Sequence, residues 1–317
     1  MLWQVGFAPI LENFSRGSVL IMDLSYFHSM RKGLLSPSGQ GDHIYIGLET
    51  EHRGEVKCLN YNDFINGNYH PVELYLDDKR RKIPRLDEWI ERFPNIEVLS
   101  LSRDLIPFRK INLDNLKSFI LCNFCDEKLS KKAHKHLWLK EQVMPNVKFY
   151  LNVEYQDIFD IGGIRFENLP NLEWLECRLD NKEKMIEIIY EFETLTSLDL
   201  SDVTNQDVFS AFRDKLRILA LTGASKKFPM KKIRNQTNLE IVYVNGYKST
   251  FDMEWLLDLK LKEIHLISCP TVVNSECLLQ MDYLESIYIL DCKKALSKEL
   301  KSRLKERNFK YLNIDYT

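Results

Sequence analysis

A leucine-based pattern recurs along most of the chain and constrains the fold more than any other feature of the sequence. In the stretch LTSLDLSDVTN, which begins at Leu195, leucines stand at the first, fourth and sixth positions. A near-copy, LRILALTGA, begins soon afterwards at Leu216. A pattern that returns at such a spacing indicates a row of similar units, none of which can bury its apolar side alone.

The same unit, written L-x-x-L-x-L-x-x-N/C, occurs repeatedly. Clear copies begin at Ile96, Leu116, Leu172, Leu195, Leu216, Leu239, Leu261, Leu284 and Phe309. A weaker copy begins at Pro71 and a slipped copy at Val147. The sixth positions recur with a nearly constant period in every step but one, and that longer step contains the charged stretch 127–140. In pattern and period together, the chain resembles the leucine-rich repeat family over roughly residues 70–317.

This resemblance implies an α/β fold, a leucine-rich repeat solenoid or horseshoe with a parallel sheet on its concave side and helices on its convex side. The first, fourth and sixth residues of each strand are expected to point into a shared core, because side chains alternate along a strand. Stacked neighbours then close that core. Family members favour Asn or Cys at the ninth position, where the side chain bonds to backbone in the turn. Cys269 and Cys292 fit this preference, but most units depart from it.

We predict two domains, an N-terminal β-rich cap at residues 1–70 and a solenoid of about ten units at residues 71–317. In the cap, the stretches GSVLIMDLSYF, DHIYIGLET and EVKCLNYNDF are typical of three strands. In the solenoid, apolar residues at spacings of three and four predict helices over 181–192, 204–215 and 296–308, with Ser297 as a cap of the last one. An independent functional domain in residues 1–70 is the alternative, with Asp23, His28 and His43 as its first catalytic candidates.

Composition excludes several classes of protein. The formal net charge is −2, which argues against a general nucleic-acid binder. No apolar run approaches the ~18 residues of a membrane span, and the first residues lack the basic start of a secretory signal. We therefore expect a cytoplasmic protein that binds neither nucleic acid nor membrane. The seven scattered cysteines are expected to be reduced thiols.

No stretch supports catalysis, a metal or a cofactor. Cys122 and Cys125, followed by His134 and His136, have the residue types of a zinc site but not the histidine spacing of a finger. A pair of satisfied thiols is the simpler interpretation. The glycines of SGQG have no helix-opening lysine after them, and motifs of hydrolases and metalloproteases are absent from the sequence. The basic stretch 127–140 is interpreted as a solvated face, with a docking loop as the alternative.

The repeat pattern also predicts which side chains lie on the concave face, since the third, fifth and seventh strand positions should project there. Aromatic and aliphatic residues at these positions suggest an exposed patch of the kind that marks protein contacts. Interleaved acids favour a basic partner. The predicted partner-binding residues are Phe149, Trp174, Glu176, Asp199, Asp202, Ile218, Ile241, Tyr243, Glu263, His265, Tyr288 and Tyr311. Coverage of some of the aromatic side chains by the N-terminal cap or by a second copy of the chain is the alternative.

The function expected from these observations is non-catalytic binding of one protein partner. The chain resembles bacterial leucine-rich-repeat immunity proteins, which implies that it neutralises a cognate toxin. The alternative is a substrate-recognition subunit of a ubiquitin ligase or a host-directed effector. We expect a monomer, with the last strand, which contains Leu312 and Ile314, as the site of any homodimer or secondary contact.

Overall fold

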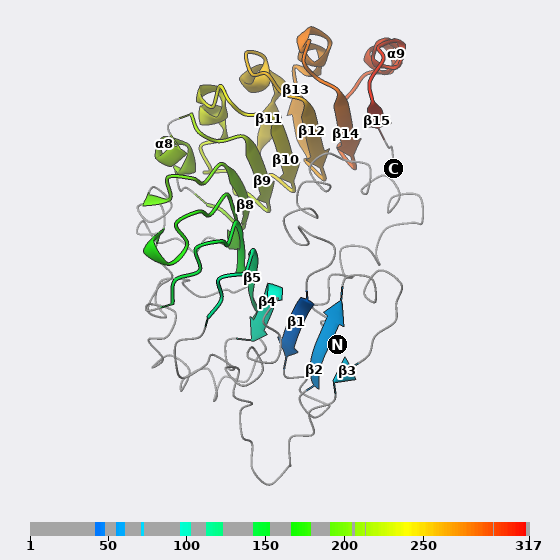
Figure 1. Ribbon diagram of the computed structural model, residues 1–317. Coiled ribbons are helices and arrows are strands. Elements are labelled where there is room, and N and C mark those ends of the chain that lie inside the picture. The colour runs from blue at the N-terminus through cyan, green and yellow to red at the C-terminus, as the bar shows by residue number, and fades with distance from the viewer. Residues whose placement is uncertain are drawn as a thin grey trace.

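A long sheet dominates the structure. The computed structural model describes the chain at residues 42–47, 55–60, 71–72, 96–102, 112–122, 142–152, 166–178, 191–204, 207–212, 214–293 and 295–314. A 13-stranded sheet runs through these residues in the order β15-β14-β12-β10-β9-β8-β7-β6-β5-β4-β1-β2-β3. Most of its strands follow one another in the sheet as they do in the chain (Figure 1).

Ten strands of the long sheet, from β4 to β15 without β11 and β13, are all parallel to one another. The strands are β4 (Ile96–Ser102), β5 (Ser118–Cys122), β6 (Phe149–Asn152), β7 (Trp174–Arg178), β8 (Ser197–Ser201), β9 (Ile218–Thr222), β10 (Ile241–Asn245), β12 (Glu263–Ile267), β14 (Ser286–Leu290) and β15 (Tyr311–Ile314). Each clear copy of the sequence pattern supplies one of them, as predicted. The slipped copy is also in register, because Phe149 pairs with Ser118 on one side and Trp174 on the other.

The N-terminal end of the sheet is built differently. Strand β1 (Asp42–Gly47) is parallel to β4, β2 (Glu55–Asn60) is antiparallel to β1, and β3 (Pro71–Val72) is antiparallel to β2. Two of the three strands predicted for residues 1–70 are therefore confirmed, and the predicted strand at 17–27 lies outside the described residues. The strand of the weak copy that begins at Pro71 would cover residues 73–77, which lie outside the described residues, whereas Pro71 and Val72 themselves pair with β2 in the antiparallel direction. Proline has no backbone N–H to donate, which suits the outermost strand that β3 occupies.

The segments that connect the parallel strands contain few α-helices in the part of the chain that the structure describes. Helix α8 (Val208–Phe212) buries Val208, Phe209 and Phe212, as its spacing predicted. Helix α9 (Lys298–Glu306) begins at the predicted cap, where the Ser297 hydroxyl accepts a hydrogen bond from Leu300 N at 3.1 Å. Most of the helix predicted over 181–192 lies outside the described residues.

Elsewhere, 3-10 turns and short strands replace α-helices. The 3-10 helices are η2 (Phe166–Asn168), η3 (Met230–Asn235), η4 (Met253–Leu256) and η5 (Ser275–Gln280). Strands β11 (Thr250–Asp252) and β13 (Thr271–Val273) pair in parallel as a second, two-stranded sheet. None of the helices in the described ranges has the length and apolar character needed to cross a membrane.

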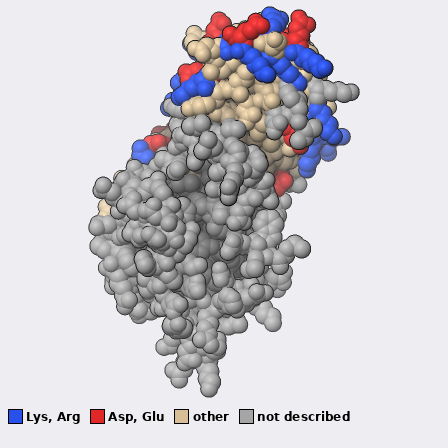
Figure 2. Space-filling view, turned by 90° about the vertical axis from the view of Figure 1, so that its right-hand side faces the viewer, with Lys and Arg blue, Asp and Glu red and all other residues tan. Residues whose placement is uncertain are grey.

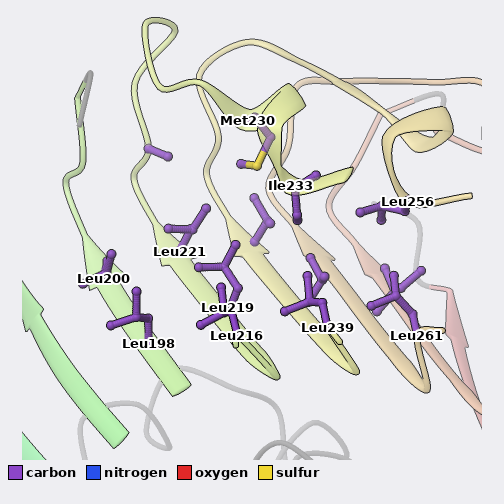
Figure 3. Close-up of a cluster of buried hydrophobic side chains, with 14 of the residues drawn as sticks. Leu198, Leu200, Leu216, Leu219, Leu221, Met230, Ile233, Leu239, Leu256 and Leu261 are labelled. Carbon is purple, nitrogen blue, oxygen red and sulfur yellow. The ribbon is translucent and has the colours of Figure 1, made fainter. Parts of the chain in front are cut away.

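The leucine core lies between the sheet and these connections. Leu200 and Leu221, the sixth residues of two neighbouring units, are both fully buried. They belong to one continuous apolar cluster with residues of η3 and η4, and Figure 3 shows leucines of successive strands and connections meeting there. The predicted inward direction of the first, fourth and sixth positions is confirmed for these units.

Candidate interaction face

The inner face is the side of the parallel sheet that carries the third, fifth and seventh positions of each strand. Trp174, Ile218 and Ile241 hold third positions and align across the sheet through the paired strands. They are buried but do not belong to the leucine core cluster. Because side chains alternate along a strand, these residues lie on the face opposite the core.

Most of the predicted partner-binding residues of this face are buried. Phe149 and Trp174 are 0% exposed, and their rings lie 6.1 Å apart between centroids. Further buried members of the predicted set are Ile218, Ile241, Glu263, His265 and Tyr288. The expectation that this strip is exposed is therefore wrong for most of the set. Neighbouring strands bring some of these side chains into direct contact, as in the Phe149–Trp174 and His265–Tyr288 ring pairs.

The accessible members of the set are Glu176, Asp199, Asp202, Tyr243 and Tyr311. Glu176 and Asp199 are direct partners in the register of β7 and β8. Asp202 follows β8 and is exposed. Three acids from two adjacent units thus lie close together at the accessible part of the inner face.

An aromatic row crosses three strands of the inner face. Tyr243, His265 and Tyr288 hold the fifth positions of β10, β12 and β14 and are direct partners in the register. The centroids of the Tyr243 and His265 rings are 5.2 Å apart, and those of His265 and Tyr288 are 4.3 Å apart with 5° between planes. Tyr243 is half-buried and forms the accessible end of this row.

A buried polar pair supports the aromatic row. His265 Nε2 lies 2.7 Å from Glu263 Oε1, and the two side chains are 4% and 1% exposed. The residues are two apart on β12 and therefore share a face. Burial, followed by the charge of Glu263 and the neighbouring Tyr311, raises the pKa of Tyr288. The structure thus holds Tyr288 as a neutral phenol.

The charges of Asp199 and Glu176 also affect a buried thiol of the leucine core, that of Cys177. Burial raises the pKa of the Cys177 thiol, and the nearby charges of Asp199 and Glu176 raise it further. Cys177 is therefore a neutral thiol at ordinary pH and is unsuited to nucleophilic chemistry, which requires the thiolate.

A row of left-handed turns follows the parallel strands. Asp202, Gly223, Gly246, Ser268 and Asp291 each come directly after a strand and have φ values between 50° and 69°. The backbone N–H of each of the first four donates to the last carbonyl of the following strand, at 2.7, 2.8, 2.8 and 2.9 Å. The sequence analysis missed this row. Its signal is the eighth position of the unit, which holds only Asp, Gly or Ser over this range.

The residue at the ninth position of each of these units, directly after the left-handed turn, is buried. The Cys269 backbone N–H donates to Cys292 Sγ at 3.4 Å, and the Cys292 thiol lies 3.4 Å from the carbonyl oxygen of Leu266. Bonding of these side chains to turn backbone was the role expected of them, and it is confirmed. Val203 and Ala224, which hold the same position in earlier units, are fully buried and have apolar side chains that cannot form such a bond.

An asparagine row lies at the opposite ends of the strands and was also missed. The side-chain amides of Asn146, Asn171 and Asn238 donate to the carbonyls of Asp114, Pro145 and Asp214, at 2.6, 2.8 and 2.7 Å. In each case the bond joins one unit to the preceding one. The signal in the sequence is an asparagine directly before the first apolar residue of the unit.

Charged residues at the second position form ion pairs between units. Arg217 Nη2 and Lys262 Nζ lie 2.8 and 2.9 Å from the two carboxylate oxygens of Glu240, and Lys148 pairs with Glu173 at 2.7 Å. Burial acts to raise the pKa of Glu240, but hydrogen bonds from Lys262 and Arg217 and their charges outweigh it, so that the pKa is lowered. These contacts stabilise the register of successive strands.

The possible zinc ligands lie mostly outside the part of the chain that the structure describes. Cys122 ends β5, whereas Cys125, His134 and His136 lie outside the described residues. Among the residues that are described, no group of three or more His, Cys, Asp or Glu side chains is arranged to hold a metal.

Comparison with known proteins gives distant relatives. No protein-family model matches the chain. Dynein regulatory complex subunit 3 from Macaca fascicularis and from Rattus norvegicus are each 23% identical over 205 residues, and the same subunit from Mus musculus is 22% identical. Each match covers 63% of this chain and 36% of the relative. The chain thus spans about a third of the length of these relatives.

Proposed function

We propose that the chain is a leucine-rich repeat solenoid that acts as a non-catalytic protein-interaction scaffold. The observation that carries this proposal is the run of parallel strands from β4 to β15, which follow chain order and bury the leucines of one repeated pattern. The similarity to a subunit of a dynein regulatory complex supports a role within a protein assembly. The proposal includes an N-terminal β-rich cap at residues 1–70 and a solenoid of about ten units at residues 71–317.

The partner footprint is proposed to centre on the accessible acids Glu176, Asp199 and Asp202 together with Tyr243. Carboxylates on neighbouring strands attract a basic surface, and a half-buried tyrosine supplies contact area at low cost in side-chain entropy. The buried members of the predicted set, such as Trp174 and His265, are proposed to hold the accessible residues in place by packing beside them. The partner in this proposal is a basic protein, bound by a monomer.

Toxin neutralisation, which the sequence analysis expects, is supported by the acidic character of this face. The relatives are subunits of an animal regulatory complex, which favours scaffolding over inhibition. We therefore place scaffolding first.

Quantitative affinity purification from the source cells tests the proposal. The full-length chain is compared with an Asp199→Lys/Asp202→Lys variant and with a control, Asp258→Lys/Asp282→Lys, which makes the same change of charge at exposed residues in turns outside the inner face. We expect a discrete set of proteins to be retained by the wild type and the control and lost from the first variant. Equal recovery with all three proteins would contradict the proposed footprint.

A further inference from the structure

We propose that the outer edge of β15 binds an extended acidic segment of another protein as an added β-strand. This surface is separate from the proposed inner-face footprint and takes the opposite charge. Strand β15 lies at the end of the 13-stranded sheet and pairs only with β14 in the described part of the chain. An edge of this kind is a template for strand addition.

The backbone pattern identifies which groups face outward. In earlier units the second-position carbonyl accepts from the following unit, as Lys262 O does from Glu285 N at 2.9 Å and from Ser286 N at 3.0 Å. Glu285 O accepts in turn from Lys310 N at 2.8 Å. Alternate residues of a parallel strand bond to the same neighbour. The Lys310 carbonyl and the backbone groups of Leu312 and Ile314 therefore face away from β14.

The side chains of this strand are incompletely covered. Leu312 and Ile314 occupy the same inward positions as Leu198 and Leu200, which are fully buried. Both residues pack against the leucine core but are only partly buried. A strand added beside β15 would remove more of their apolar surface from water, which is favourable.

The charge around this edge selects the chemistry of the added strand. Basic side chains of α9 and the segment that follows it are Lys298, Lys301, Arg303, Lys305, Arg307 and Lys310, and the acids described in the same region are Asp282, Glu285, Glu299 and Glu306. Figure 2, which shows the molecule from the side on which β15 lies, has Lys and Arg side chains interspersed with Asp and Glu side chains on the described surface. An acidic segment therefore complements the edge.

A second copy of the chain is a poorer occupant. Pairing of β15 with β15 would bring two basic ends together, and juxtaposed like charges oppose association. An extended segment of alternating apolar and acidic residues satisfies both features of the edge, because its apolar side chains extend the core and its negative charge is attracted by the lysines and arginines of this end.

Peptide binding to the full chain tests the inference. The probe is a short fluorescent peptide of alternating valine and glutamate, and its control replaces every glutamate by lysine. Fluorescence anisotropy is compared for the wild type, for Arg303→Glu/Lys310→Glu and for Lys226→Glu/Lys227→Glu, which reverses two exposed charges far along the chain from β15. We expect the acidic peptide to bind the wild type and the second variant, and the first variant to lose about tenfold or more in affinity.

Hydrogen exchange identifies the mode of binding. We expect the amides of Leu312 and Ile314 to exchange rapidly in the chain alone and slowly with the acidic peptide bound. Slow exchange in the chain alone would show that the edge is already covered and would overturn the inference. The inference would also be overturned if the lysine peptide bound as tightly as the acidic one, if both variants lost the same affinity, or if the acidic peptide did not bind the wild type. None of these results bears on the inner face, so the proposed scaffold function is tested separately.

Discussion

The imidazole of His265 lies flat on the phenol ring of Tyr288, with 4.3 Å between ring centroids and 5° between ring planes. The same imidazole is held by Glu263, whose Oε1 atom lies 2.7 Å from its Nε2 atom. Neighbouring strands of a sheet are about 4.8 Å apart, so two planar side chains at paired positions stack with little adjustment. The inner face at this end of the sheet is consequently a packed, polar and aromatic layer.

Removal of one member of the buried pair should be costly. Glu263→Ala or His265→Ala leaves a buried polar group without this hydrogen bond, and we expect each to lower the free energy of unfolding by about 1 to 3 kcal/mol. The double variant should lose less than the sum of the two, by about 1 to 3 kcal/mol. Urea denaturation of the four proteins measures this coupling. Strict additivity would contradict a direct interaction.

Trp174 should behave as a structural residue. It is 0% exposed, so Trp174→Ala is expected to lower the free energy of unfolding by about 3 to 5 kcal/mol. Tyr243→Ala, at a half-buried position, should cost less. Thermal and chemical denaturation compare the two variants, and an unchanged stability for Trp174→Ala would show that its side chain is accessible in solution.

Leu200→Ala provides a test of the leucine core. Leu200 is fully buried within the continuous cluster, and the cavity left by the truncation should cost about 2 to 5 kcal/mol. Thr222→Ala, at an exposed position of the next strand, is expected to change stability by less than about 0.5 kcal/mol. A similar small change for both variants would contradict the inward direction of the sixth position.

The two glycines of the left-handed turns should respond differently to alanine. Both have positive φ, 69° at Gly223 and 68° at Gly246, so either substitution should cost about 1 kcal/mol. A Cβ on Gly223 would also approach Asp202 Oδ1 to 2.9 Å, whereas one on Gly246 would meet nothing closer than 3.9 Å. We expect Gly223→Ala to be the worse variant, and Asp202→Ala in the same chain to remove the difference. An equal cost with Asp202 present would show that its carboxylate moves aside freely.

Stability should fall on the alkaline side through Cys177. Its pKa is raised in the folded chain, so the folded state keeps a proton that the unfolded state releases above about pH 8.5. The contribution of this thiol is fully present below that pH and is lost progressively as the pH rises toward the folded-state pKa. At alkaline pH the unfolded chain is stabilised because its Cys177 thiol ionises, whereas the buried thiol of the folded chain stays protonated. Cys177→Ala removes this difference, so its free energy of unfolding should fall less steeply than that of the wild type between neutral and alkaline pH. An identical slope in both proteins would contradict the burial of this thiol.

The sequence alone was sufficient for the features that repeat. The repeated pattern at the first, fourth and sixth positions predicted the parallel strands of the long sheet from β4 to β15, with β6 as a slipped copy, and the burial of Leu200 and Leu221. The spacing of Phe209 and Phe212 predicted α8, and Ser297 predicted the start of α9. These features follow from local periodicity, because a unit with one apolar side has few ways to bury it.

The accessibility of the inner face was decided by tertiary structure. Trp174, Ile241 and His265 alternate with core leucines and were expected to meet solvent, yet all three are buried. Likewise, Pro71 begins a stretch that resembles a repeat, but β2 pairs with it in the antiparallel direction. Alternation assigns a side chain to one face of a strand and says nothing of what packs on that face. Coverage depends on contacts between segments far apart in the chain, and only the folded structure contains them.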